Sequence, residues 1–156
     1  MILGFTGTQS FGPGELARVD LCLQGLADRL EPTTVVTGGC VGIDAYVHGW
    51  FGRERPDVRR IVVVPANRSK VYLPVLTTAD EVVEMPPDSD YRARNVEMVR
   101  RADTMAAFWT GKTRFSGTWM TMNIAAKQRK LAPENVFGMR LLSDEEARSR
   151  YFFQLP

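Results

Sequence analysis

The sequence is short of the residues that build metal centres, disulfide frameworks and membrane spans. It holds one histidine, His48, and two cysteines, Cys22 and Cys40. A single histidine excludes a site of several histidines, and the cysteines lack the close spacing of zinc knuckles or disulfide scaffolds. No run approaches the roughly 18 apolar residues of a membrane span, and residues 1–10 lack the basic start of a secretory signal. We therefore expect no metal, no membrane partner and a cytoplasmic location.

Strong charge and the common nucleotide motifs are also missing. Twenty basic and 18 acidic side chains leave a formal net charge of +2, which gives no strong overall field for duplex DNA. No G-x-x-x-x-G-K-[ST] run occurs, and Thr37 stands where a G-x-G-x-x-G motif would begin in segment 37–44. We expect neither P-loop ATP hydrolysis nor a resident cofactor.

What the chain does contain is a regular alternation of strand-like and helix-like segments. Its 156 residues suit a single domain over 1–156, with a short helix and tail from about 143, where Ser143 and Glu146 form a capping box. Apolar spacing predicts strands at 2–6, 33–37, 60–64, 81–84, 104–109 and 135–139, and helices at 15–30, 43–51, 91–102 and 118–129. The alternation predicts an α/β, Rossmann-like three-layer fold: a mainly parallel sheet with helices on both faces.

Glycine, hydroxyl and amide residues follow the predicted strands, where ligands bind in parallel sheets. Glycine lets the backbone approach a ligand closely, and the N–H groups of a helix start favour an anion such as phosphate. This pattern predicts a phosphate-binding rim. The candidate ligand-binding residues are Gly7, Thr8, Gly38, Gly39, Gly42, Asp44, Pro65, Arg94, Asn95, Ser116, Gly117 and Thr118.

Several blocks, in this order, resemble one superfamily. They are GFTGTQ near the start, TGGCVGID at 37–44, the pair Arg94-Asn95, and SGTWMT at 116–121. This set is similar to the superfamily that joins the DNA-processing DprA/Smf proteins with the lonely-guy (LOG) phosphoribohydrolases, abbreviated SLOG. Order and spacing hold from about residue 1 to 140. The resemblance implies a Rossmann-like binder of a nucleotide or a nucleotide-derived molecule.

Two further functions follow from the same resemblance. Lonely-guy enzymes imply cleavage of the N-glycosidic bond of nucleoside monophosphates, but Thr121 stands where those enzymes carry their glutamate, so no catalytic residue is identified. Glu84 and Glu97 are the carboxylates that could replace it as acid or base. The DNA-processing relatives imply binding of single-stranded DNA, for which the basic runs 53–60 and 127–130 are candidates if they share a face.

Some residues keep two interpretations. Asp44 could pair with His48 one helical turn away, or hydrogen-bond ribose hydroxyls as acidic residues do in dinucleotide sites. Arg92 and Arg94 could grip phosphate, because arginine in a first helical turn opposes the helix dipole, or lie solvated on the surface. The tail residues Tyr151, Phe152 and Phe153 could pack on the sheet or form a homodimer contact.

Overall fold

The computed structural model describes residues 1–111 and 116–140. The strands are β1 (Ile2–Gly7), β2 (Thr34–Thr37), β3 (Arg59–Val64), β4 (Glu81–Glu84), β5 (Thr104–Trp109) and β6 (Leu131–Gly138). The α-helices are α1 (Leu16–Leu30), α2 (Ile43–Glu54), α3 (Pro74–Thr78), α4 (Tyr91–Arg101) and α5 (Gly117–Lys127), and a 3₁₀ turn, η1, spans Pro13–Glu15.

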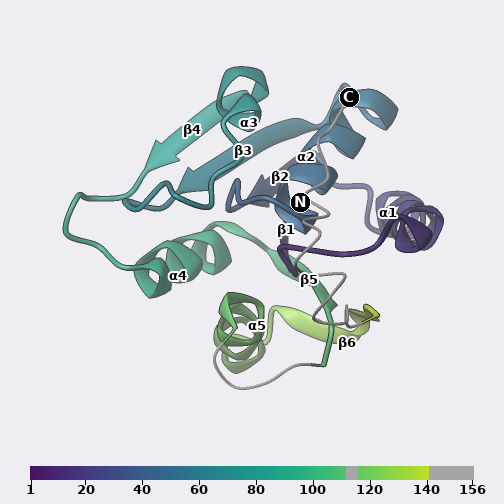
Figure 1. The fold of residues 1–156 in the computed structure, drawn as a ribbon. Helices are drawn as coiled ribbons and strands as arrows, with labels where there is room; N and C mark the ends of the chain where they lie inside the picture. The colour runs from purple at the N-terminus through teal and green to yellow at the C-terminus, as the bar shows by residue number, and fades with distance from the viewer. Residues whose placement is uncertain (112–115, 141–156) are drawn as a thin grey trace.

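The six strands form one sheet in the order β4-β3-β2-β1-β5-β6, and every neighbouring pair is parallel (Figure 1). The predicted Rossmann-like α/β class is therefore confirmed. From β1 to β4 the chain adds strands on one side of β1, and it then crosses to the other side for β5. The direction of winding thus reverses between β1 and β5, and such switch points are where parallel sheets bind ligands.

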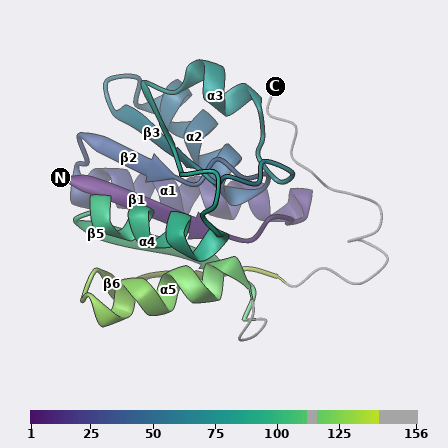
Figure 2. The ribbon, with the colours of Figure 1, turned by 90° about the vertical axis from the view of Figure 1, so that its left-hand side faces the viewer.

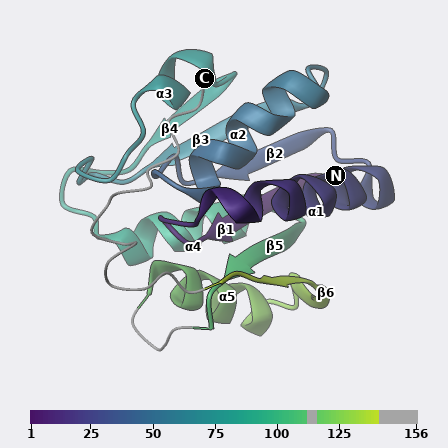
Figure 3. The ribbon, with the colours of Figure 1, turned by 45° about the vertical axis from the view of Figure 1, so that its right-hand side comes forward.

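Helices cover both faces of the sheet (Figures 2 and 3). Helices α1 and α2 lie on one face, over a core that includes Leu3, Phe5 and Val35. Helices α4 and α5 lie on the other face, where Val36 and Met98 are buried. Because side chains alternate along a strand, the apolar runs of β1, β2, β3 and β5 supply the cores on both faces.

Differences from the predicted elements are small and have local causes. Helix α3 was not predicted, because five residues that begin with a proline carry no helical period. Strand β6 starts at Leu131, four residues earlier than expected, and runs through Pro133 at the edge of the sheet, where no ladder donor is required. The helix expected from Ser143 lies outside the described residues. Within the described part of the chain, no helix has the length and apolarity needed to cross a membrane.

Candidate functional site

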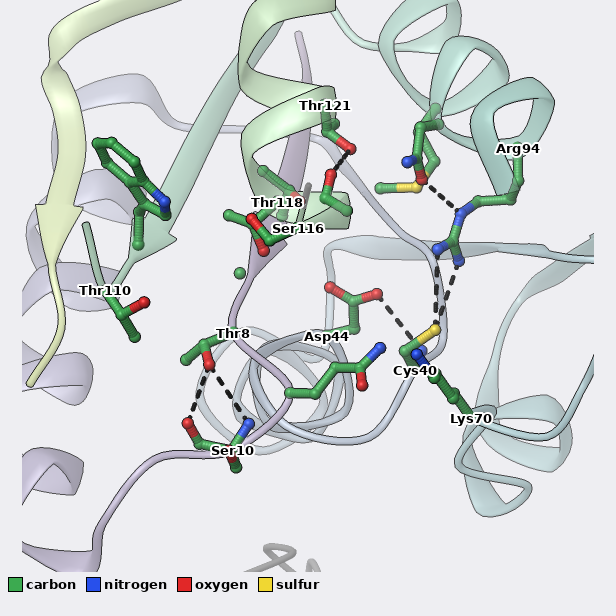
Figure 4. Close-up of a pocket in the computed structure, with 17 residues that line it drawn as sticks. Thr8, Ser10, Cys40, Asp44, Lys70, Arg94, Thr110, Ser116, Thr118 and Thr121 are labelled. Atoms are coloured by element: carbon green, nitrogen blue, oxygen red, sulfur yellow. Dashed lines mark hydrogen bonds between the residues drawn. The ribbon is translucent and has the colours of Figure 1, made fainter. Parts of the chain in front are cut away.

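A cavity of about 330 Å³ opens where the connections after β1 and β5 diverge (Figure 4). The loop after β1 turns toward α1 on one face, and the loop after β5 leads to α5 on the opposite face. Two neighbouring parallel strands whose connections leave in opposite directions hold a crevice open between them. The cavity therefore lies at the switch point of the sheet.

Eight of the twelve predicted ligand-binding residues line this cavity. They come from four segments that are far apart in sequence: the end of β1 and the starts of α2, α4 and α5. These residues are Gly7, Thr8, Asp44, Arg94, Asn95, Ser116, Gly117 and Thr118.

Gly38, Gly39, Gly42 and Pro65 are not among the residues that line the cavity, so their predicted contact with a ligand gains no support from its wall. The backbone amides around them are used within the protein: Ile43 N–H donates to the Thr8 carbonyl at 3.0 Å, and Val41 N–H donates to the Lys70 carbonyl at 2.9 Å. The glycine-rich turn after β2 therefore joins three loops together and does not present these amides to the cavity.

Asp44, in the first turn of α2, is buried on the cavity wall. Its Oδ2 accepts a hydrogen bond from the Cys40 N–H at 3.3 Å, and its other oxygen points into the cavity (Figure 4). Burial raises the pKa of Asp44 to about 6, although Arg94 and the Cys40 and Gly38 N–H groups act to lower it. A carboxylate held this way is charged at neutral pH at a considerable desolvation cost.

Asp44 does not pair with His48, so that interpretation is wrong. His48 Nε2 lies 2.8 Å from Thr78 Oγ1 and 3.5 Å from Arg60 Nη1, on a different side of α2 from the cavity. Burial and the Arg60 charge lower the pKa of His48 to about 4. The imidazole is therefore a neutral, buried group.

Arg94 is buried in the cavity wall, and most of its donors are occupied. Nη1 donates to the Gly38 carbonyl at 2.6 Å, Nε donates to Asn95 Oδ1 at 2.9 Å, and both terminal nitrogens lie 3.7 Å from Cys40 Sγ. Its guanidinium also lies over the Tyr91 ring at 5.5 Å. A Cβ at Gly38 would come within 2.2 Å of Nη1, so this glycine makes room for the arginine. Arg94 supplies charge to the cavity but is mainly a structural link between α4 and the turn after β2.

Arg92 does not line this cavity, so of its two interpretations the solvated surface arginine fits the structure. Its side chain is exposed and lines a separate groove between α4 and α5. Position 92 and position 94 lie about 200° apart around a helix, so they face different surroundings.

Cys40 and Lys70 also line the cavity but were not among the predicted residues. Both are placed by an antiparallel bridge between Cys40 and Val71, which brings the loop after β3 onto the turn after β2. Lys70 is exposed, with its Nζ 6.0 Å from the Tyr91 ring centre. Burial and the Asp44 charge raise the pKa of the Cys40 thiol, which keeps it protonated at neutral pH. Hydroxyl groups of Thr6, Ser10, Thr110 and Thr121 were missed as well.

Helix α5 brings its N-terminal turn to the cavity. Ser116 Oγ caps the helix by accepting from the Trp119 N–H at 3.1 Å, and Thr121 Oγ1 donates to the Gly117 carbonyl at 2.8 Å. The N–H groups of Gly117 and Thr118 have no partner within the helix, as in any first turn, and these residues lie on the cavity wall.

Glu84 and Glu97 are absent from the cavity wall, so neither stands in for the missing glutamate. Glu84 is exposed and pairs with Arg68, and Glu97 pairs with Arg100 and Arg101 at 2.7 Å. These arginines lower the pKa of Glu97 to about 2. Among the described residues, Asp44 is the one carboxylate on the wall, and no group of three or more potential ligands is placed to hold a metal ion.

The fold and its strand-end cavity define a Rossmann-like α/β protein. No protein-family model matches the chain, and no curated protein matches it by sequence. Among solved structures, it is similar to DNA processing protein A from Helicobacter pylori, reported for its single-stranded DNA binding mode, with a TM-score of 0.64 and 18% identity over 96% of this chain and 70% of that one. It is also similar to the structural-genomics target TM1055, with a TM-score of 0.58 and 16% identity over 95% of this chain and 96% of that one. At these identities the likeness shows the fold.

Proposed function

We propose that this chain is a single-domain, SLOG-type module that binds a nucleotide or nucleotide-derived molecule in the strand-end cavity. The observation that carries the proposal is the convergence of hydroxyl groups, two cationic side chains and one helix start on a single cavity at the switch point. The order of the sequence blocks that resemble the SLOG superfamily, together with the likeness to DNA processing protein A, supports the same class of ligand.

The start of α5 is the best place for a phosphate. The N–H groups of Gly117 and Thr118, the hydroxyl of Thr118 and the positive end of the helix dipole all favour an anion there. Lys70 and Arg94 make the opposite wall cationic, and a volume of about 330 Å³ is at the lower end of the usual range for small-ligand pockets. We therefore expect a ligand of mononucleotide size.

Isothermal titration with nucleoside monophosphates, cyclic nucleotides and ADP-ribose derivatives tests this proposal. Lys70→Met removes an exposed cavity charge and is expected to weaken binding by about 2- to 5-fold, the effect of one solvated charge on an anion. Lys127→Met is the matched control, because Lys127 is also exposed but lies away from the cavity. Absence of heat across the panel, from protein with a cooperative unfolding transition, would refute the proposal.

Single-stranded DNA is a second candidate, favoured by a different surface. The groove between α4 and α5 is lined by Arg92, Lys127 and Trp119 and contains no carboxylate among its described lining residues. Trp119 is half-buried and lies two helical turns before Lys127. The groove therefore places an aromatic ring next to basic side chains, although run 127–130 itself contains no aromatic residue. Stacking on an aromatic ring beside cationic side chains is how proteins hold unpaired bases.

Fluorescence anisotropy with a labelled oligonucleotide over a range of salt concentrations tests this candidate. The double variant Arg92→Gln with Lys127→Gln should reduce the salt slope by about 1 to 2, because fewer counterions are released. Lys70→Met is the comparison that separates groove from cavity. A salt-independent signal, or a slope that the double variant leaves unchanged, would contradict binding in this groove.

The hydrolase alternative finds no supporting carboxylate where lonely-guy enzymes have theirs. Thr121 lines the cavity, but its hydroxyl is bonded to the backbone of its own helix. Incubation with nucleoside monophosphates, followed by chromatography for free base, reports any turnover directly.

A further inference from the structure

One oxygen of Asp44 is left open to the cavity. The side chain is 7% exposed, so it is almost fully withdrawn from bulk water. Oδ2 accepts from the Cys40 N–H and lies next to Gly38, whose N–H also stabilises the carboxylate. Oδ1 makes none of the side-chain hydrogen bonds found among the described residues and points toward the space between Thr8 and Thr118 (Figure 4). A buried carboxylate oxygen without a donor is costly, which makes it a strong acceptor for a ligand that brings one.

The surrounding residues keep this oxygen open. The nearest cation, Arg94, directs Nη1 and Nε to the Gly38 carbonyl and to Asn95, and within the described part of the chain it forms no ion pair with Asp44. The absent side chain at Gly38 leaves space for both groups, because a Cβ there would lie 2.8 Å from Asp44 Oδ2. Arg94 therefore fixes the backbone next to Asp44 and leaves Asp44 Oδ1 accessible to a ligand.

A carboxylate oxygen without a hydrogen-bond donor repels phosphate and attracts hydroxyl donors. The wall at Asp44 therefore favours a different group of the ligand from the wall at the start of α5. Phosphate is favoured at the start of α5, and a group with hydroxyl donors is favoured beside Asp44. In a nucleotide, the group that carries such donors next to the phosphate is the ribose, with its 2′- and 3′-hydroxyls.

We propose that Asp44 selects for the ribose hydroxyls, so that the cavity prefers ribonucleotides to 2′-deoxyribonucleotides. This inference rests on the proposed function, since it names the ligand class of the same cavity. A hydroxyl that donates to a buried charged acceptor is expected to improve affinity by roughly 10- to 100-fold. A 2′-deoxynucleotide cannot supply that donor and leaves the oxygen unpaired.

Titration with adenosine, guanosine, cytidine and uridine monophosphates, beside their 2′-deoxy and 3′-deoxy forms, tests the proposal in the wild-type chain. At pH 7.5 we expect the 2′-deoxy form of each bound nucleotide to bind roughly 10-fold more weakly, or worse, and the 3′-deoxy forms show whether the second hydroxyl contributes. In Asp44→Asn, which keeps the shape but not the charge, the ratio should fall to less than about 3-fold, because the amide no longer offers a charged acceptor to the 2′-hydroxyl.

Lowering the pH gives a second measurement that needs no variant. Asp44 takes up a proton near pH 6, so the preference for ribonucleotides should shrink between pH 7.5 and pH 5 in wild type and stay constant in Asp44→Asn. The other ionisable groups on the described wall are Cys40, Lys70 and Arg94. Their effects, and the titration of the phosphate itself, act on both ligands alike and cancel in the ratio.

The outcomes separate the two proposals. If nucleotides bind but the ribo and 2′-deoxy forms differ by less than about 2-fold at pH 7.5, the role of Asp44 is refuted and the proposed function stands. If no nucleotide binds, both fail. If Asp44→Asn does not fold, the pH series in wild type decides, and a ratio that is constant with pH refutes the proposal.

Discussion

Gly42 shows how one residue can fix the geometry of a site without lining it. It adopts φ 89° at the start of α2, a conformation that glycine adopts far more readily than other residues. A Cβ at this position would lie 2.5 Å from the backbone of Gln9, so the turn after β2 and the loop after β1 meet backbone to backbone. This contact fixes the loop that carries Thr8 against the start of the helix that carries Asp44, and both residues line the cavity.

Gly42→Ala should therefore lower the free energy of unfolding by about 2–4 kcal/mol, from the left-handed backbone and the forced shift of Gln9. Gly25→Ala is the control: Gly25 lies within α1, a Cβ added there would meet nothing within 4 Å, and alanine should stabilise by about 0.5–1 kcal/mol. Urea unfolding measures both. A Gly42→Ala protein within about 1 kcal/mol of wild type would contradict the tight contact.

At the same scale, local pattern predicted some wall residues and could not predict others. Asp44, Arg94 and Thr118 lie within short motifs that directly follow a strand or open a helix, so their position relative to the sheet edge is set locally. Lys70 reaches the cavity only through the pairing of its neighbour Val71 with Cys40, a residue from an earlier part of the chain. No periodicity or turn signal encodes such a contact. Conversely, the glycines at 38–42 formed a clear local pattern for ligand binding, but in the structure their turn packs against neighbouring loops.

Among the elements, α5 combines a structural cap with the proposed anion site. Ser116 is the N-cap, and the same turn brings Gly117 and Thr118 to the cavity wall. The two roles can be separated by substitution, because a carboxylate also caps a helix well and favours its dipole but repels a bound anion.

Ser116→Ala should lower stability by about 1 kcal/mol through loss of the cap, with a minor effect on nucleotide affinity. Ser116→Asp should keep near wild-type stability and weaken nucleotide binding by more than about 10-fold, since its charge faces the phosphate. Thermal unfolding and isothermal titration on the same samples give both quantities. Undiminished affinity in Ser116→Asp would place the phosphate elsewhere in the cavity.

The elements themselves were well predicted where their period was long. Helix α1 and strand β3 match expectation to within one residue, because 15 residues of helical spacing and an unbroken apolar run are strong signals. The start of β6 was missed, since residues 131–134 include a proline and a glutamate, and only the ladder with β5 makes them a strand. Tertiary pairing overrides local preference at an edge of this kind.

For the molecule as a whole, the predicted class followed from alternation of elements, but the strand order did not. Nothing in the sequence states that β5 lies beside β1, and that single adjacency creates the switch point and the cavity. The same arrangement buries two ionisable groups on α2: Asp44 toward the cavity and His48 toward α3. The pKa of Asp44 is raised and that of His48 is lowered, so their contributions to stability change with pH in opposite directions.

Asp44 has a folded-state pKa of about 6, above its ordinary value, so its contribution to stability is fully present in acid and is lost as pH rises through 6. His48 has a folded-state pKa of about 4, below its ordinary value, so its contribution is fully present above pH 6.5 and is lost as pH falls through 4. Each changes the free energy of unfolding by at most about 1.4 kcal/mol per pH unit, with opposite signs. Because the two contributions cancel, they should leave the wild-type free energy of unfolding nearly constant between about pH 4.5 and 6.

Single variants should reveal the two slopes. In Asp44→Asn the effect of His48 remains, so stability should rise with pH across this window, by up to about 2 kcal/mol. In His48→Gln, which can still hydrogen-bond Thr78, stability should fall with pH by a similar amount. Urea unfolding at half-unit steps measures the slopes, and the double variant should be as flat as wild type. Parallel pH profiles for the two single variants would show that these residues are not the buried, opposing pair that the fold places on α2.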